Sequence, residues 1–83
     1  MQIRIKDMNG RIYTCENTEN DIDKVLNIDK YNFIVKRESK IYFSKINGII
    51  ISEDLDKLKD NDVLYLNMKV KNYMFEKSIP KVV

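Results

Sequence analysis

Residues 1–16, MQIRIKDMNGRIYTCE, predict the first supersecondary element of the chain, a β-hairpin. Ile3 and Ile5 alternate with polar side chains, so one face of the first strand is expected to be buried and the other solvated. The pair Asn9-Gly10 is typical of tight turns between strands, because both residue types tolerate a positive φ. We therefore expect two antiparallel strands to open the chain.

A short amphipathic helix is expected after this hairpin. Thr18 and Asn20 are the two candidate N-caps, since the side-chain oxygen of either can accept a hydrogen bond from the first helical turn. Ile22, Val25 and Leu26 follow at the i, i+3 and i+4 spacing that forms one apolar stripe. Asp29 stands at the next position of this stripe, so the helix is expected either to end near Asn27 or to bend so that Ile28 joins the apolar face.

The rest of the chain contains four apolar runs that predict strands. The last run is the clearest, because Leu64 and Leu66 flank Tyr65 and so define a core-facing row. The triple isoleucine after the second Asn-Gly pair predicts a strand buried on both faces, since β-branched side chains suit a sheet interior. The four runs span residues 31–35, 40–43, 49–51 and 63–71.

Taken in order, these segments resemble ubiquitin and the ubiquitin-like family over residues 1–71. Residues 40–43 and 64–69 are similar to two of the ubiquitin strands, and the opening hairpin is similar as well. The resemblance implies an α+β fold of the β-grasp type, a mixed sheet of four or five strands packed on one short helix. It also implies that the first strand lies beside the last, and that residues 72–83 are a C-terminal extension of the domain. The hairpin residues of the same type as in ubiquitin are Met1, Gln2, Ile3, Lys6, Gly10, Thr14 and Glu16.

The end of the chain departs from ubiquitin, which finishes in a Gly-Gly tail whose carboxylate becomes the isopeptide. Here Asn72 and Tyr73 stand at the aligned positions. Because such side chains do not fit the narrow clefts of activating enzymes, conjugation of the ubiquitin kind is not expected. Two readings of residues 74–83 stay open, an apolar segment that docks on the domain or on a partner, and a frayed terminus.

The composition predicts one small domain in a reducing compartment. The 83 residues, of which 43% are hydrophobic, provide a single core. No apolar run approaches the ~20 residues that span a bilayer, and no apolar signal segment opens the chain. Cys15 has no partner for an internal disulfide, which favours the cytoplasm, or the host cytoplasm if the protein is viral. The abundance of Ile, Lys and Asn suggests an AT-rich genome, as in a virus or a bacterium.

The inventory of reactive side chains argues against an enzyme. The chain has no histidine, the residue best suited to proton transfer near neutral pH. Cys15 is interpreted as a buried thiol within a strand rather than a nucleophile. Residues 60–62, Asp-Asn-Asp, are too short a ligand set for calcium, and the two glycines are too far apart for a phosphate loop. We therefore expect no catalysis, no metal and no cofactor.

The functional surface is expected on the solvated face of the sheet. Tyr42 and Tyr65 are expected to share this face with basic side chains, which gives an aromatic, positively charged surface. The resemblance implies that the hydrophobic patch gripped by most ubiquitin receptors corresponds to Met8, Tyr42 and Asn67. Because Asn67 is polar, we expect weak binding to generic receptors, and a dedicated protein partner anchored on tyrosine and methionine. An ordinary solvated sheet face is the alternative. The candidate residues are Arg4, Lys6, Met8, Lys40, Tyr42, Tyr65, Asn67 and Lys69.

These features predict a non-catalytic ubiquitin-like module that binds a protein partner, as a viral or bacterial mimic or inhibitor would. Two alternatives remain, a modifier joined to its target through an unorthodox C-terminus and a small nucleic-acid-binding domain. The second is less favoured, because a net charge of +2 without an arginine cluster offers phosphates little to bind. No membrane association is expected, and the sequence does not specify an oligomeric state.

Overall fold

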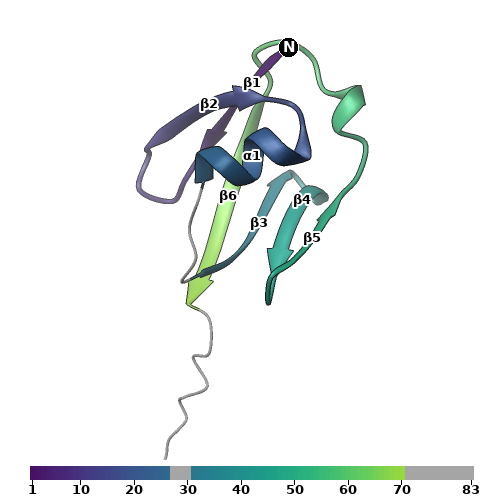
Figure 1. Cartoon of the computed structure of the whole chain (residues 1–83). Coiled ribbons are helices and arrows are strands. Elements are labelled where there is room, and N and C mark those ends of the chain that lie inside the picture. Colours follow the sequence, from purple (N-terminus) through teal and green to yellow (C-terminus); the bar gives the residue numbers. More distant parts are fainter. Residues whose placement is uncertain (27–30, 71–83) are drawn as a thin grey trace, which may run out of the picture.

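The computed structural model describes residues 1–26 and 31–70, with side chains up to residue 68 (Figure 1). Within these residues the fold is α+β, with one α-helix packed on a mixed six-stranded sheet. The predicted extension, residues 72–83, lies outside the described part of the chain. The elements are β1 (Gln2–Lys6), β2 (Ile12–Glu16), α1 (Glu19–Leu26), β3 (Tyr31–Arg37), β4 (Lys40–Ile46), β5 (Ile49–Ser52), the 3₁₀ helix η1 (Leu55–Lys57) and β6 (Val63–Val70).

The strands lie in the order β2-β1-β6-β3-β4-β5. β1 runs parallel to β6, with Ile5 beside Leu64, and the other neighbouring pairs are antiparallel. The prediction that the first strand lies beside the last is therefore confirmed. The described sheet has six strands rather than four or five, because β3 and β5 both pair fully with their neighbours.

The hydrophobic core lies between the sheet and α1, which crosses one face of the sheet (Figure 1). Phe33 and Phe43 stack at its centre with their ring centroids 5.9 Å apart. Full burial of an apolar side chain of this size stabilises a fold by about 1.5–3 kcal/mol, so the inner faces of the strands supply most of the stability. The buried residues of the core are Ile3, Ile5, Cys15, Ile22, Leu26, Phe33, Val35, Tyr42, Phe43, Leu58, Leu64 and Leu66.

The predicted helix is confirmed in position and in the face that it buries. The hydroxyl of Thr18 accepts a hydrogen bond from the backbone N–H of Asp21 at 3.2 Å, which makes Thr18 the N-cap. Ile22 and Leu26 are buried against the sheet, and Val25 packs beside them. The apolar stripe thus fixes α1 across the sheet.

Two turns at opposite ends of the sheet use glycine with a positive φ. Gly10 (φ 86°) closes the β1–β2 hairpin, and the Asp7 carboxylate accepts hydrogen bonds there from the N–H groups of Asn9 and Arg11, both at 2.9 Å. Between β4 and β5, Asn47 (φ 52°) and Gly48 (φ 82°) form the two-residue loop with positive φ at both positions that suits a tight hairpin. Each predicted Asn-Gly turn is confirmed.

The expectation that the triple-isoleucine strand is buried on both faces is wrong. β5 is the last strand of the sheet order, and α1 covers only one face of the sheet. Ile50 is half-buried on the helix side, whereas Ile49 is 65% exposed and Ile51 is 55% exposed. An edge position thus leaves two large aliphatic side chains in water.

β4 carries a β-bulge at Tyr42. The register pairs Val35 with Phe43 and Lys36 with Ile41, which leaves Tyr42 as an extra residue on β4. An inserted residue reverses the alternation of side chains beyond it. Ile41 therefore points away from α1, and Tyr42 turns inward and is only 7% exposed.

Candidate protein-binding surface

The sheet has a second face, on the side opposite α1, which we call the outer face. Ile3, Ile5, Leu64 and Leu66 point into the core, so the residues that alternate with them on β1 and β6 point outward. The outward residues of these two central strands are Gln2, Arg4, Lys6, Val63, Tyr65 and Asn67.

Aliphatic side chains dominate the outer face over β3, β4 and β5. We call Ile34, Ile41, Ile46, Ile49 and Ile51 the isoleucine patch. Its members are neighbours in the ladder: Ile46 pairs with Ile49, and Ser44 lies between Ile34 and Ile51. Four of the five are between 39% and 65% exposed, and Ile34 is partly buried. A contiguous apolar surface of this kind is a mark of interaction sites.

A hollow of about 510 Å³ lies at one end of the isoleucine patch. Met8, in the turn after β1, lines it together with Ile34 and Ile46. Asn67 of β6 contributes a polar amide, which matches the pattern of an apolar site with a few polar groups. The other lining residues are Asn32, Phe33 and Met68.

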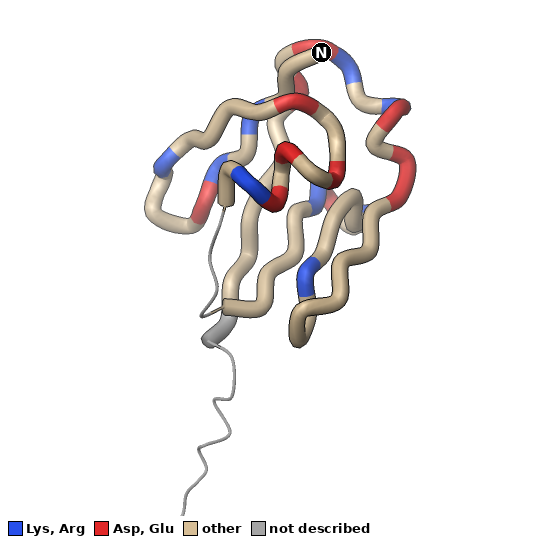
Figure 2. Tube along the Cα trace, viewed as in Figure 1, with Lys and Arg blue, Asp and Glu red and all other residues tan. Residues whose placement is uncertain are grey.

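The central part of the outer face is basic. The register places Lys6, Tyr65, Lys36 and Ile41 in one row across four adjacent strands. Tyr65 is 50% exposed, so its ring is available between the two lysines. Figure 2 shows that acidic residues gather elsewhere, along α1 and on the segment between β5 and β6.

Tyr42 and Lys40 do not lie on the outer face, so their predicted placement beside Tyr65 is wrong. The bulge turns the Tyr42 ring inward, where the Arg37 guanidinium carbon lies 5.6 Å and Lys40 Nζ 5.2 Å from its centroid. Arg37 donates a hydrogen bond to the Tyr42 hydroxyl at 3.3 Å. These residues form a structural cluster on the side of the core.

Ion pairs tie this cluster to the acidic segment before β6. The Asp62 carboxylate accepts a hydrogen bond from the Lys59 N–H at 2.7 Å and lies 3.1 Å from the Arg37 guanidinium. These contacts lower the pKa of Asp62 below its usual range, and the backbone hydrogen bond from Lys59 has the largest effect. The hydrogen bond from Lys40 likewise lowers the pKa of Asp54. Arg37 and Lys40 are therefore engaged in contacts within the fold.

The remaining predicted surface residues fall into two groups. Arg4, Lys6 and Tyr65 lie together at the basic centre of the outer face. Met8 and Asn67 line the hollow. The side chain of Lys69 lies outside the described side chains.

Sequence reasoning missed the isoleucine patch, although one of its signals was present. A four-residue strand that follows a two-residue Asn-Gly turn is a short terminal hairpin, and such a strand commonly forms a sheet edge. If residues 49–52 are interpreted as an edge strand, Ile49 and Ile51 are predicted to be exposed. Ile34 has no comparable signal, since it sits between Phe33 and Val35 in an unbroken apolar run.

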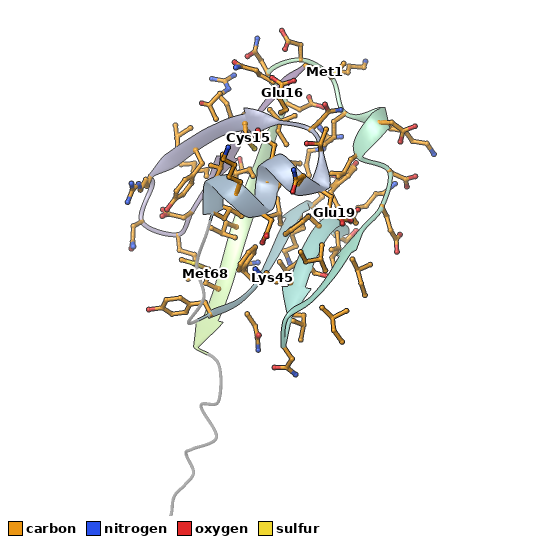
Figure 3. All side chains as sticks on the ribbon, in the orientation of Figure 1. Met1, Cys15, Glu16, Glu19, Lys45 and Met68 are labelled. Carbon is orange, nitrogen blue, oxygen red and sulfur yellow. The ribbon has the colours of Figure 1, made fainter. Side chains whose placement is uncertain are left out.

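Cys15 lies in the core, as the sequence predicts. Its side chain is 4% exposed, between β2 and α1 (Figure 3). Burial, reinforced by the charges of Asp21 and Glu16, raises the pKa of the thiol to about 11. The thiol is thus protonated at neutral pH, which makes it a weak nucleophile.

The described residues contain neither a metal-binding cluster nor a membrane-spanning helix. Among residues 1–26 and 31–70, no cluster of three or more Cys, Asp or Glu side chains is arranged to hold a metal ion. No helix in the same ranges has the length and apolar character needed to cross a lipid bilayer.

Comparison with known proteins gives no relative for this chain. No protein-family model, curated protein or solved structure matches it.

Proposed function

We propose that this protein is a non-catalytic, ubiquitin-like module of β-grasp type that binds a protein partner through the outer face of its sheet. The β-grasp fold in this proposal is supported by the parallel pairing of β1 with β6 and by the way α1 crosses one face of the sheet. A buried, protonated Cys15 agrees with a role in binding rather than chemistry. In this proposal the protein acts in the cytoplasm of a bacterium or of a virus-infected cell, as a mimic or inhibitor.

The isoleucine patch is the single observation that carries the binding role. Ile41, Ile49 and Ile51 are each about half exposed, and Ile34, Ile46, Ile49 and Ile51 gather around Ser44 in the ladder. Covering a half-exposed isoleucine contributes roughly 1 kcal/mol, so the patch can supply several kcal/mol to an interface. Specific protein complexes of micromolar affinity need about 8 kcal/mol after the cost of association. The patch therefore needs help from polar or charged contacts around it.

Site-specific photocrosslinking tests this role. A photoreactive phenylalanine analogue would replace Ile51 on the outer face and, as the control, Lys24 on the opposite side of the molecule. In the cytoplasm of bacterial or virus-infected cells, we expect discrete protein adducts from position 51. Position 24 should give no adduct of the same mass. The adducts should disappear when Ile41→Asp is added, because a carboxylate in the patch disrupts apolar contact. Identical adducts from both positions, or none from either, would overturn the proposal.

A further inference from the structure

Tyr65 lies at the centre of the outer face between two lysines. Lys6 of β1 and Lys36 of β3 are its neighbours in the ladder, on either side of β6. Neighbouring strands are about 5 Å apart, so the α-carbons of the two lysines are separated by roughly 10 Å. Their flexible side chains can thus reach two groups on a molecule that rests on the tyrosine ring.

The positive charge of this row is not neutralised by the described side chains. The ion pairs found in residues 1–26 and 31–68 engage Arg37, Lys40, Lys45 and Lys57, and include neither Lys6 nor Lys36. Arg4, next along β1, donates to a neutral group, the backbone carbonyl of Asn61 at 3.2 Å.

The acidic side chain that β2 places on this face has another partner. Glu16, the carboxylate that β2 contributes to this face, is paired with the Met1 ammonium at 2.7 Å (Figure 3). On the helix side, Asp23 is paired with Lys45 at 2.9 Å. Among the described side chains, Lys6 and Lys36 therefore have no ion-pair partner at the centre of the outer face, where Lys36 lies beside Ile41 of the isoleucine patch.

We infer that the outer face selects an acidic protein segment, one with carboxylates on both sides of an apolar side chain. This inference rests on the proposed function and names the chemistry of the partner. The apolar side chain would rest on the Tyr65 ring, and the carboxylates would meet Lys6 and Lys36 on its two sides. Exposed ion pairs are individually weak, but opposite charge at an interface speeds association and excludes basic competitors.

The same surface fits nucleic acid less well. Single-stranded nucleic acids bind to sheets through several aromatic rings on which successive bases stack, combined with a groove of cations. Tyr65 has no aromatic neighbour in the described ladder of this face: Lys6 and Lys36 flank it, and Ile41 lies beyond Lys36. Aliphatic side chains match an apolar protein segment better than a base.

Selection from a random peptide library on the intact protein tests the inference. We expect the enriched peptides to carry carboxylates around a leucine, isoleucine or aromatic residue. For a synthetic copy of the best peptide, the double variant Lys6→Gln with Lys36→Gln should weaken binding by about tenfold. Glutamine substitution of the peptide carboxylates should have the same effect. Lys24→Gln, on α1, is the matched control and should leave the affinity unchanged.

The possible outcomes separate this inference from the proposed function. Enriched peptides that are neutral or basic, but are lost on Ile51→Ser, would overturn the acidic partner and leave the binding role intact. Peptides insensitive both to the lysine pair and to Ile51→Ser, or no enriched peptides at all, would overturn both. Oligothymidylate that binds more tightly than every selected peptide at physiological salt would overturn the inference in favour of nucleic acid.

Discussion

Ile34 of β3 lies directly opposite Asn67 of β6 in the antiparallel ladder. Both side chains point to the outer face and line the same hollow, which Met8 also lines. The resemblance to ubiquitin implies instead that Tyr42 accompanies Met8 and Asn67 in a hydrophobic patch. In the structure β3 separates β4 from β6, so Ile34 takes the place that Tyr42 was expected to hold.

The edge strand β5 makes the first prediction possible. Ile49 and Ile51 are exposed on a strand that has no charged residue among its four, and uncharged edges pair readily with other chains. We expect Ile49→Lys to reduce self-association at high concentration, measured by sedimentation velocity. The free energy of unfolding should change by no more than about 0.5 kcal/mol, since the side chain is in water. Lys24→Ala, away from the edge strand, is the control and should leave self-association unchanged. If Lys24→Ala reduced self-association as much as Ile49→Lys, the prediction would be contradicted.

The inward position of Tyr42 can be tested by two substitutions of different severity. Tyr42→Ala removes a core ring and should cost about 3 kcal/mol or more in urea unfolding. Tyr42→Phe keeps the ring but loses the 3.3 Å hydrogen bond from Arg37, and should cost about 0.5–1 kcal/mol. The same pair of changes at Tyr65, which is 50% exposed, should cost much less. Equal costs of Tyr42→Ala and Tyr65→Ala would place Tyr42 on the surface.

Asp7 is a polar residue whose burial is explained by its hydrogen bonds. It is 8% exposed, and one carboxylate oxygen accepts both N–H bonds of the first turn. Asp7→Ala leaves these donors without a protein partner, and we expect it to destabilise the fold by about 1–3 kcal/mol. Asp7→Asn keeps an acceptor oxygen and should cost clearly less, by the same unfolding measurement. Equal losses in the free energy of unfolding for the two variants would show that the Asp7 oxygen does not stabilise the turn by accepting these hydrogen bonds.

Cys15 should make the folded protein less stable at alkaline pH. Its pKa is raised to about 11 in the folded protein, so the unfolded chain loses the thiol proton at lower pH than the folded one. Stability should therefore decline as pH rises from about 9 towards 11, and Cys15→Ala should remove that part of the decline. At neutral pH, native thiol should react with a disulfide reagent at least about a hundredfold more slowly than in urea. Rapid reaction of the native protein would show that the thiol is accessible.

Asp62 should make the protein less stable at acidic pH, in contrast to the alkaline effect of Cys15. Its pKa is lowered in the folded state, so its stabilising effect is present above the ordinary carboxyl pKa. The effect is lost as pH falls through the lowered value. Asp62→Asn should thus flatten the decrease in stability between pH 5 and the acid unfolding transition, measured by urea titration at each pH. Asp56→Asn, on the exposed η1, serves as the control and should keep the wild-type profile.

The elements that local sequence dictates were predictable, and those that depend on distant neighbours were not. The alternation of Ile3 and Ile5, the Thr18 cap and the Leu64–Leu66 row each carry their signal within a few residues. The bulge at Tyr42 does not, because it arises from how β4 must meet both β3 and β5. For the surface, Arg4, Lys6 and Tyr65 followed from simple alternation, whereas the isoleucine patch required knowledge of which strands form the edge.

The separation of the two sheet faces has a further consequence. The rings of Phe33 and Phe43 and the buried stripe of α1 hold the molecule together from one side, while the other side is left in water. Replacements among the outward isoleucines and lysines leave that interior untouched. A lineage could therefore exchange one binding target for another in a few mutational steps, and a designer could use the domain as a scaffold with one face free to vary.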